Sequence, residues 1–364
     1  MKVKDVADIL EELAPLEYAE DFDNVGLLIG DQDMNVTNIL VTLDSLENVI
    51  DEAISKSCNL IISFHPILFK GIKNLTGSNY VERAIIKAIQ NNISIYCLHT
   101  ALDNAIDGVN AKICEVLGVI NTKILIPQKG TIKKLTTYIP ETHAEALLKS
   151  LFKAGAGSIG NYSECSFTVD GTGSYKAGKN ANPVKGNKGE LHLEKETQIN
   201  VTFPRNKEKS VLTALFDNHL YEEVAYEVST LDNVDSQIGM GMIGELEEPL
   251  AEKDFLAFIK NKMNVSCIRH SGFLGKKIRK VAVLGGSGAF AIGAAKKSGA
   301  DIFITSDVKY HQFFEAENKI LIADIGHYET EQFTKNLLVD YLTKKMPNFA
   351  ISLSESITNP IKYY

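Results

Sequence analysis

The sequence predicts an α/β protein in which one domain is built from two separate halves of the chain, with a smaller ferredoxin-like α+β domain inserted between them. Strand-length apolar runs alternate with helical patterns over residues 1–126 and again over residues 236–364. Between them, residues 127–235 contain two consecutive strand, helix, strand patterns. At 364 residues the chain also exceeds the roughly 100–200 residues of a typical domain.

The first half begins with a helix and continues as alternating strands and helices. Apolar periodicity predicts helices over residues 3–13, 46–56 and 80–90, and strands over residues 38–43, 59–63 and 93–98, with a short apolar run over residues 27–30. A strand, helix, strand unit of this length implies parallel strands joined by a right-handed crossover.

The second half repeats this layout. It predicts strands over residues 280–284, 301–305 and 319–325, helices over residues 289–298 and from His327 onward, and another helix between the last two strands. The glycine-rich residues 285–288 resemble a phosphate-binding loop but lack the full dinucleotide spacing, so a tight strand-to-helix turn is favoured. Four strands, two in each half, end in segments rich in His and Asp, as an approximate duplication would give. We expect one sheet system with one site at the carboxyl ends of its strands.

The central segment has a different pattern. We expect strands over residues 132–139, 164–169, 197–203 and 222–228, helices over residues 143–153 and 207–220, and domain edges near residues 126 and 236. Residues 171–187 are poor in apolar side chains and are predicted to be a loop, functional or mobile.

Composition limits the classes of function. The chain is 45% hydrophobic and 23% charged, as in ordinary globular proteins, and its net charge of −8 disfavours nucleic-acid binding. It shows no signal-peptide pattern and no apolar run near the roughly 18 residues of a membrane helix. Five widely spaced cysteines form no CxxC pair, so a cytoplasmic location is expected.

Four side chains form a candidate metal site: His65, Asp103, His327 and Glu331. His327 and Glu331 are four residues apart and would share one helix face. Mixed nitrogen and oxygen donors suit zinc, iron, manganese or nickel better than calcium. A bridging carboxylate could hold two ions about 3.5–4 Å apart, an arrangement typical of hydrolysis.

Each candidate has a structural alternative. His65 could simply be held by the turn at Pro66, and Asp103 could be a helix N-cap. His99 could contact substrate, but a core histidine bonded to backbone is favoured. Asp307 and His311 could join the site or support it from behind. His99 and His311 are the candidate proton carriers.

With these residues in view, the chain resembles the GTP cyclohydrolase 1 type 2 homologue family, also called the Ngg-interacting-factor-like proteins, over essentially its whole length. The resemblance is carried by several motifs in order. They are Asp23-Asn24-Val25-Gly26-Leu27, Ser63-Phe64-His65-Pro66 with Phe69-Lys70, His99-Thr100-Ala101-Leu102-Asp103, Gly160-Asn161-Tyr162-Ser163-Glu164-Cys165-Ser166-Phe167, Tyr221-Glu222-Glu223-Val224-Ala225-Tyr226, Asp307-Val308-Lys309-Tyr310-His311 and Gly326-His327-Tyr328-Glu329-Thr330-Glu331.

This resemblance implies a dinuclear metal site in the discontinuous domain, an insert resembling the PII and CutA folds, and a toroidal homohexamer. His65, Asp103 and Glu331 match the ligands of one ion, and His327 and Glu331 match ligands of the second. The family usually has a further histidine ligand of the second ion where this chain has Phe64. Because phenylalanine cannot coordinate a metal, the second ion is expected to bind weakly or to be absent.

The expected function is that of a metal-dependent hydrolase acting on a nucleotide or related heterocycle through activated water. The alternative is a metal-binding regulatory or adaptor protein without catalysis, whose insert senses a small molecule or recruits a partner. The loss of a ligand at Phe64 favours this alternative. Fold and type of site do not fix a substrate.

Overall fold

The computed structural model describes residues 1–364, and the chain divides into two compact units. Met1–Pro127 and Ser236–Tyr364 together form one unit, here called the main domain, and Gln128–Asp235 forms the other, called the insert. None of the helices is long and apolar enough to cross a membrane.

The first sheet of the main domain has five strands in the order β1-β4-β3-β2-β15. These are β1 (Gly26–Ile29), β2 (Ile39–Thr42), β3 (Leu60–Ser63), β4 (Ser94–Cys97) and β15 (Ile351–Leu353). All neighbouring pairs are parallel except β1 with β4. Helices α2 (Glu47–Ser55) and α3 (Tyr80–Gln90) share a core with one face, and α1 (Val3–Leu13) and α11 (Thr334–Lys345) share a core with the other.

The second sheet has six strands in the order β11-β14-β13-β12-β10-β5. These are β5 (Val119–Pro127), β10 (Gly239–Ala251), β11 (Arg269–His270), β12 (Lys277–Ser287), β13 (Ile302–Ser306) and β14 (Leu321–Asp324). The central strands β12, β13 and β14 are parallel. Helices α5 (Val109–Leu117) and α8 (Glu252–Lys262) share a core with one face, and α9 (Ile292–Lys297) shares a core with the other.

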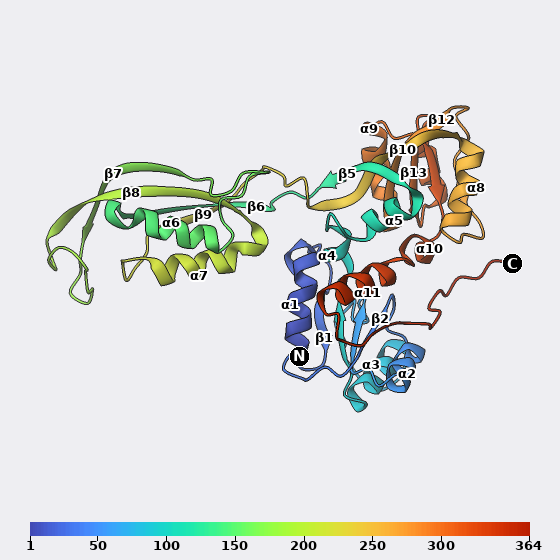
Figure 1. The fold of residues 1–364 in the computed structure, drawn as a ribbon, viewed down its shortest axis with the longest axis horizontal. Coiled ribbons are helices and arrows are strands. Elements are labelled where there is room, and N and C mark those ends of the chain that lie inside the picture. The colour runs from blue at the N-terminus through green and yellow to red at the C-terminus, as the bar shows by residue number, and fades with distance from the viewer. The chain divides into compact units, whose positions relative to one another are not determined.

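The expectation of one sheet joining the two halves is therefore wrong. Each half has its own parallel strands with both faces buried, so each completes its own sheet. The halves are nevertheless interlocked, because β15 from the second half joins the first sheet. In return, β5 from the first half joins the second sheet beside β10 (Figure 1). One hydrophobic core includes side chains from both sheets, which holds the carboxyl ends of their strands near each other.

The insert has the element order β-α-β-β-α-β: β6 (Ile132–Pro140), α6 (Ala144–Lys153), β7 (Phe167–Lys176), β8 (Leu191–Pro204), α7 (Glu208–Asn218) and β9 (Tyr226–Thr230). Its antiparallel sheet has the order β7-β8-β6-β9, and both helices cover one face (Figure 1). The loop expected over residues 171–187 is partly wrong, because β7 continues to Lys176 in register with β8. That end of β7 is mostly exposed, so it carries no apolar signal in the sequence.

Candidate metal centre

His65 follows the end of β3 in the first half of the main domain. Its backbone N–H donates to the Leu43 carbonyl at 2.8 Å, which fixes the residue at the carboxyl end of the sheet. Its ring Nδ1 forms a hydrogen bond of 2.9 Å with Oδ1 of Asp44, a residue that follows β2. Because β2 and β3 are parallel neighbours, the carboxylate and the imidazole emerge side by side.

His327 is held in the same way in the second half. It begins the short helix α10 (His327–Glu331) just after β14, and its Nδ1 forms a hydrogen bond of 2.7 Å with Oδ2 of Asp307. Asp307 follows β13, the parallel neighbour of β14, and has a positive φ of 56°. Asp307 thus takes the supporting position, one of the two expected for it from the sequence.

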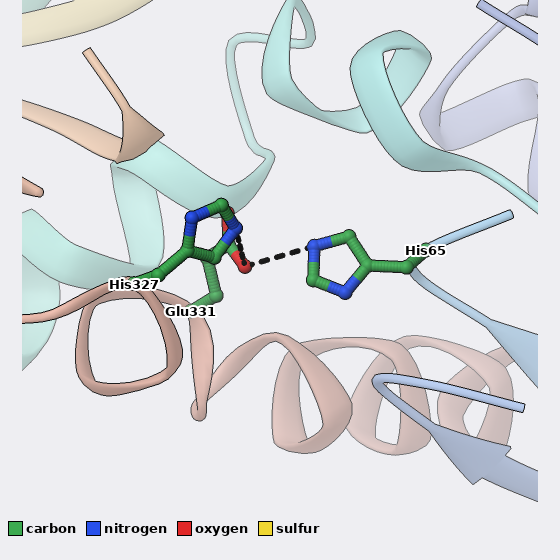
Figure 2. Close-up of side chains that lie close together, drawn as sticks. All are labelled: His65, His327 and Glu331. Atoms are coloured by element: carbon green, nitrogen blue, oxygen red, sulfur yellow. Dashed lines mark ion pairs between the residues drawn. The ribbon is translucent and has the colours of Figure 1, made fainter. Parts of the chain in front are cut away.

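Glu331 lies between the two histidines. Its Oε2 is 3.1 Å from His65 Nε2 and 3.3 Å from His327 Nε2, as the dashed lines in Figure 2 show. The Glu331 side chain is only 4% exposed, so water does not replace a missing partner. Its buried Oε2 nevertheless has no partner with hydrogen-bond geometry. Three donor atoms, one from each residue, all lie within 4.8 Å of one another; we call these residues the three-donor cluster.

A glycine makes room for the Glu331 carboxylate. Gly286 ends the glycine pair of β12 with a φ of +67°, and a Cβ there would lie 2.4 Å from Glu331 Oε1. The Gly286 backbone N–H also donates to Thr330 Oγ1 at 2.9 Å, next to Glu331 on α10. The turn expected over residues 285–288 is therefore shorter than predicted: β12 continues to Ser287, and only Gly288 separates it from the 3₁₀ helix that starts at Ala289.

The two imidazoles and the carboxylate of the cluster shift one another's pKa values toward the charged forms. Burial alone would lower the pKa of His65, but its hydrogen bond to Asp44 and the nearby Glu331 raise that pKa to about 10. Burial likewise disfavours the charged form of His327, yet Glu331 and Asp307 raise its pKa to about 9. Burial would raise the pKa of Glu331, but the two imidazoles hold it down to about 2. Cation and carboxylate therefore favour each other strongly at this position.

The donor set fits a divalent metal ion. Metal-binding histidines commonly donate one ring N–H to a carboxylate, which leaves the other nitrogen free to coordinate. Both histidines here use Nδ1 for an aspartate and turn Nε2 toward Glu331. Two imidazole nitrogens and one carboxylate oxygen are typical ligands of zinc and similar ions.

Asp103 is half-buried near this cluster but is not one of its three donors. It is the last residue of α4 (His99–Asp103), so the N-cap interpretation is wrong; the next helix, α5, begins at Val109. Its Oδ1 is buried without a hydrogen-bond partner. Burial and then the charge of Glu331 raise the pKa of Asp103 well above its usual range, although His65 and His327 oppose this. An added cation would favour its ionised form, so Asp103 as a fourth ligand stays a prediction.

His99 lies beside the cluster with its ring centre 5.4 Å from that of His65. The expectation that its ring bonds to backbone is wrong, because its Nδ1 lies 2.8 Å from Oδ1 of Asp23. Oδ2 of Asp23 accepts hydrogen bonds from the backbone N–H and the hydroxyl of Thr100 at 3.1 and 2.5 Å. Burial would raise the pKa of Asp23, but the bonds from His99 and Thr100 lower it to about 2. The backbone of His99 is itself strained, with a φ of 28°.

The other proposed proton carrier, His311, is not brought to the cluster. It lies on an exposed 3₁₀ segment, Tyr310–Ala316, where its ring contacts Tyr310 and Phe314. Sequence spacing placed it four residues after Asp307, but the chain turns away after Val308, which is buried. A catalytic role for His311 has no support in this geometry.

Phe64 is completely buried beside the candidate ligands. Its ring centre lies 4.9 Å from that of His65 and 5.6 Å from that of His99. It thus fills with hydrocarbon the place where the resemblance predicts a further histidine. The three-donor cluster contains no substitute for that ligand.

The sequence did not predict that three residues take part in the site: Asp44, Asp23 and Gly286. Asp44 had a detectable signal, since it follows a buried strand just as His65 and Asp307 do. The roles of Asp23 and Gly286 depend on contacts with residues far away in the chain, His99 and Glu331. Spacing along the sequence carries no record of such contacts.

Comparisons with known proteins agree over the full length. The model of the Duf34/NIF3 (NGG1p interacting factor 3) family matches residues 1–360. The chain is 36% identical over 368 aligned positions to a "GTP cyclohydrolase 1 type 2 homolog" of Bacillus subtilis, covering 98% of this chain and 97% of that one.

Solved structures give the same result. A Bacillus cereus protein related to NIF3 has a TM-score of 0.83 and 36% identity, over 100% of this chain and 99% of its own. A Staphylococcus aureus protein has a TM-score of 0.78 and 30% identity, over 100% and 99%. The chain therefore belongs to the Duf34/NIF3 (NGG1p interacting factor 3) family.

Proposed function

We propose that this protein is a metal-dependent hydrolase that acts on a nucleotide or a related heterocycle. The observation that carries the proposal is the three-donor cluster, in which His65, His327 and Glu331 converge without hydrogen bonds among their facing atoms. The names of the curated relatives, which mention GTP cyclohydrolase, suggest the substrate class.

The residues would divide the work as follows. His65, His327 and Glu331 would hold a divalent ion, zinc, iron, manganese or nickel, with Asp103 as a further ligand. A bound divalent ion supplies a Lewis acid and lowers the pKa of a water molecule. Asp44 and Asp307 keep both Nδ1 atoms occupied, so the imidazoles are fixed in orientation before any ion arrives.

His99 is the best candidate for moving a proton. Asp23 occupies its Nδ1, and the ring lies against that of His65 at the cluster. The arrangement of a carboxylate, an imidazole and a reacting centre is typical of general acid–base catalysis. His99 would take a proton from water and pass it to the leaving group.

A second candidate function is a regulatory or adaptor role without catalysis, and Phe64 favours it. A dinuclear site at this position would lose one ligand to Phe64, so at most one ion would be held tightly. In either case we propose that the insert belongs to the PII and CutA class of folds and that the chain assembles into a homohexamer. Light scattering on the purified protein tests the hexamer.

Metal content per chain is the first test. The protein is purified without chelator or added metal, as wild type and as Phe64→His, and its ions are counted by mass spectrometry. We expect about one ion in wild type, rising toward two in the variant. Two ions in wild type would mean that Phe64 is compensated. No ion in either protein would overturn the metal site itself.

Activity is tested by a broad nucleotide hydrolysis screen on the metal-loaded protein. We expect turnover that is lost in His65→Ala and Asp103→Ala and kept in His143→Ala, a control on an exposed histidine of the insert. No turnover of any nucleotide, with metal content intact, would favour the regulatory role over the hydrolase.

A further inference from the structure

The insert has a cavity of its own, independent of the metal centre and of the proposed hydrolase. Its volume is about 630 Å³, within the range of roughly 300–1,000 Å³ that is usual for small-molecule sites. We call it the insert pocket. Its walls come from β7, from the segment that follows β7 and from residues 221–225 before β9.

The floor of the insert pocket is the sheet face that the helices leave uncovered. Alternate residues of β6, such as Leu135 and Ile139, are buried in the core shared with α6 and α7. Tyr138 points to the opposite face, paired in register with Gln198 of β8. Both line the insert pocket. A strand that is apolar toward the helices is thus polar and aromatic toward the cavity.

Two glycines of β7 keep this floor open. Gly171 has nothing within 4 Å of the place where a Cβ would be, so the backbone faces open space. A Cβ on Gly173 would lie 1.9 Å from Glu196 Oε2, so that carboxylate lies directly on the strand. Glycine in a strand interior often marks a close approach by a ligand or another group.

Aromatic rings form part of the wall. Tyr175 and Tyr221 meet edge to face, with ring centres 6.0 Å apart. The Tyr221 hydroxyl donates to Glu196 Oε1 at 2.7 Å, and the Tyr175 hydroxyl donates to the Lys185 carbonyl at 2.8 Å. Burial and then the hydrogen bond to Glu196 raise the pKa of Tyr221, so this phenol stays neutral. The rings therefore offer π-faces rather than negative charge.

The charged groups of the wall have one predominant sign. Four carboxylates line the insert pocket, against one basic residue, Lys176: these are Asp170, Glu196, Glu222 and Glu223. Lys185, on the neighbouring segment, is paired with Glu194 at 2.6 Å. A phosphate or carboxylate ligand would meet net repulsion here.

We propose that the insert pocket binds a small organic cation, an ammonium, amidinium or guanidinium group carried on an apolar body. Tyrosine faces attract cations, and carboxylates supply charge-assisted hydrogen bonds to N–H donors. The apolar body would lie over Tyr138 and the glycine-lined part of β7. The pocket is thus a second ligand site. Like the metal centre it would favour a cation, but an organic one that donates N–H hydrogen bonds and brings an apolar body rather than a metal ion.

A matched series of three probes tests the charge preference: benzamidinium, neutral benzamide and the benzoate anion. They share one ring and nearly one shape, so only charge differs. Binding to the intact full-length protein is measured by saturation-transfer NMR and by titration calorimetry. We expect benzamidinium to bind at least about tenfold more tightly than benzamide, the factor given by one charge-assisted hydrogen bond, and benzoate not to bind.

Substitutions of single carboxylates test whether benzamidinium binds in the insert pocket. Glu196→Gln should weaken benzamidinium binding about tenfold, and Glu223→Gln, at an exposed position of the wall, should weaken it about threefold without any risk to folding. Glu145→Gln on α6 removes the same charge outside the insert pocket and should change nothing. No benzamidinium binding, benzoate binding as well as benzamidinium, or equal effects of all three variants would each overturn the proposal.

Discussion

The two halves of the main domain hold one histidine each in the same way. In each half a histidine follows one parallel strand, and its Nδ1 is held by an aspartate that follows the neighbouring strand. His65 pairs with Asp44 in the first half, and His327 pairs with Asp307 in the second. The strand pairs β2 with β3 and β13 with β14 are equivalent in this respect.

The two aspartate–histidine pairs differ in their exposure to solvent and in their neighbours. His65 and Asp44 are 23% and 31% exposed, whereas His327 and Asp307 are 36% and 47% exposed. Only the second half supplies Glu331, the donor that lies between both histidines. The full set of three donors therefore needs both halves, and the more deeply placed first pair should matter more to affinity.

The largest effect is expected where the halves share a single residue. Glu331→Gln removes the charge between the two histidines and should lower metal affinity by more than the roughly 10–100-fold that is usual for outer-shell partners. Metal content and competition with a chelating dye measure it. Glu329→Gln, a buried carboxylate on the same helix that bonds to Asn359, is the control. Full metal content in Glu331→Gln would refute the shared-ligand description.

The two supporting aspartates allow a direct comparison. Asp44→Asn and Asp307→Asn should each weaken metal binding roughly 10–100-fold, because an amide holds the imidazole less firmly. The effect should be larger for Asp44, whose pair is less exposed. Equal losses, measured by the same chelator competition, would show that burial does not distinguish the halves.

The Asp23–His99 pair is present only in the first half and makes stability depend on pH. The pKa of Asp23 is about 2 in the folded protein against an ordinary value of 3.8. Its stabilisation, about 2 kcal/mol, is complete above pH 4 and is lost as the pH falls toward 2. Urea unfolding of wild type and Asp23→Asn should show a difference that shrinks over this range. A difference that is constant with pH would contradict the assignment.

The smallest effect concerns a residue near the C-terminus. Burial would raise the pKa of Asp44, but the His65 ring and, to a smaller extent, the Thr358 hydroxyl lower it. Thr358→Val should weaken metal binding only about twofold to fivefold, as expected for one neutral donor. Ser356→Ala, nearby on the same segment, should leave affinity unchanged. The reverse order would remove Thr358 from the site.

Local elements of this fold could be predicted from the sequence. The helices over residues 3–13 and 80–90 have the bounds expected from apolar periodicity, and α10 begins at His327 as expected. The meeting of His65 with His327 and Glu331 followed from placing ligands at strand ends. Each of these depends on a pattern contained within one segment.

Features that depend on distant contacts could not be predicted. Nothing in the sequence shows that β5 joins the second sheet and β15 the first, because the choice of a neighbouring strand depends on residues far away in the chain. The Asp23–His99 bond and the fit of Glu331 against Gly286 are of the same kind. The pairing of residues 171–176 with β8 was missed because exposed edge residues carry no apolar alternation.

The exchange of β5 and β15 has a consequence for biosynthesis. The first sheet lacks its edge strand until Ile351–Leu353 has left the ribosome, although its other four strands are made among the first hundred or so residues. The insert, whose six elements are consecutive, can fold while the second half is still being translated. Metal loading thus becomes a late, post-translational event, and a nascent chain arrested before His327 would leave the ribosome with His65 and Asp44 in place but without the donors of the second half.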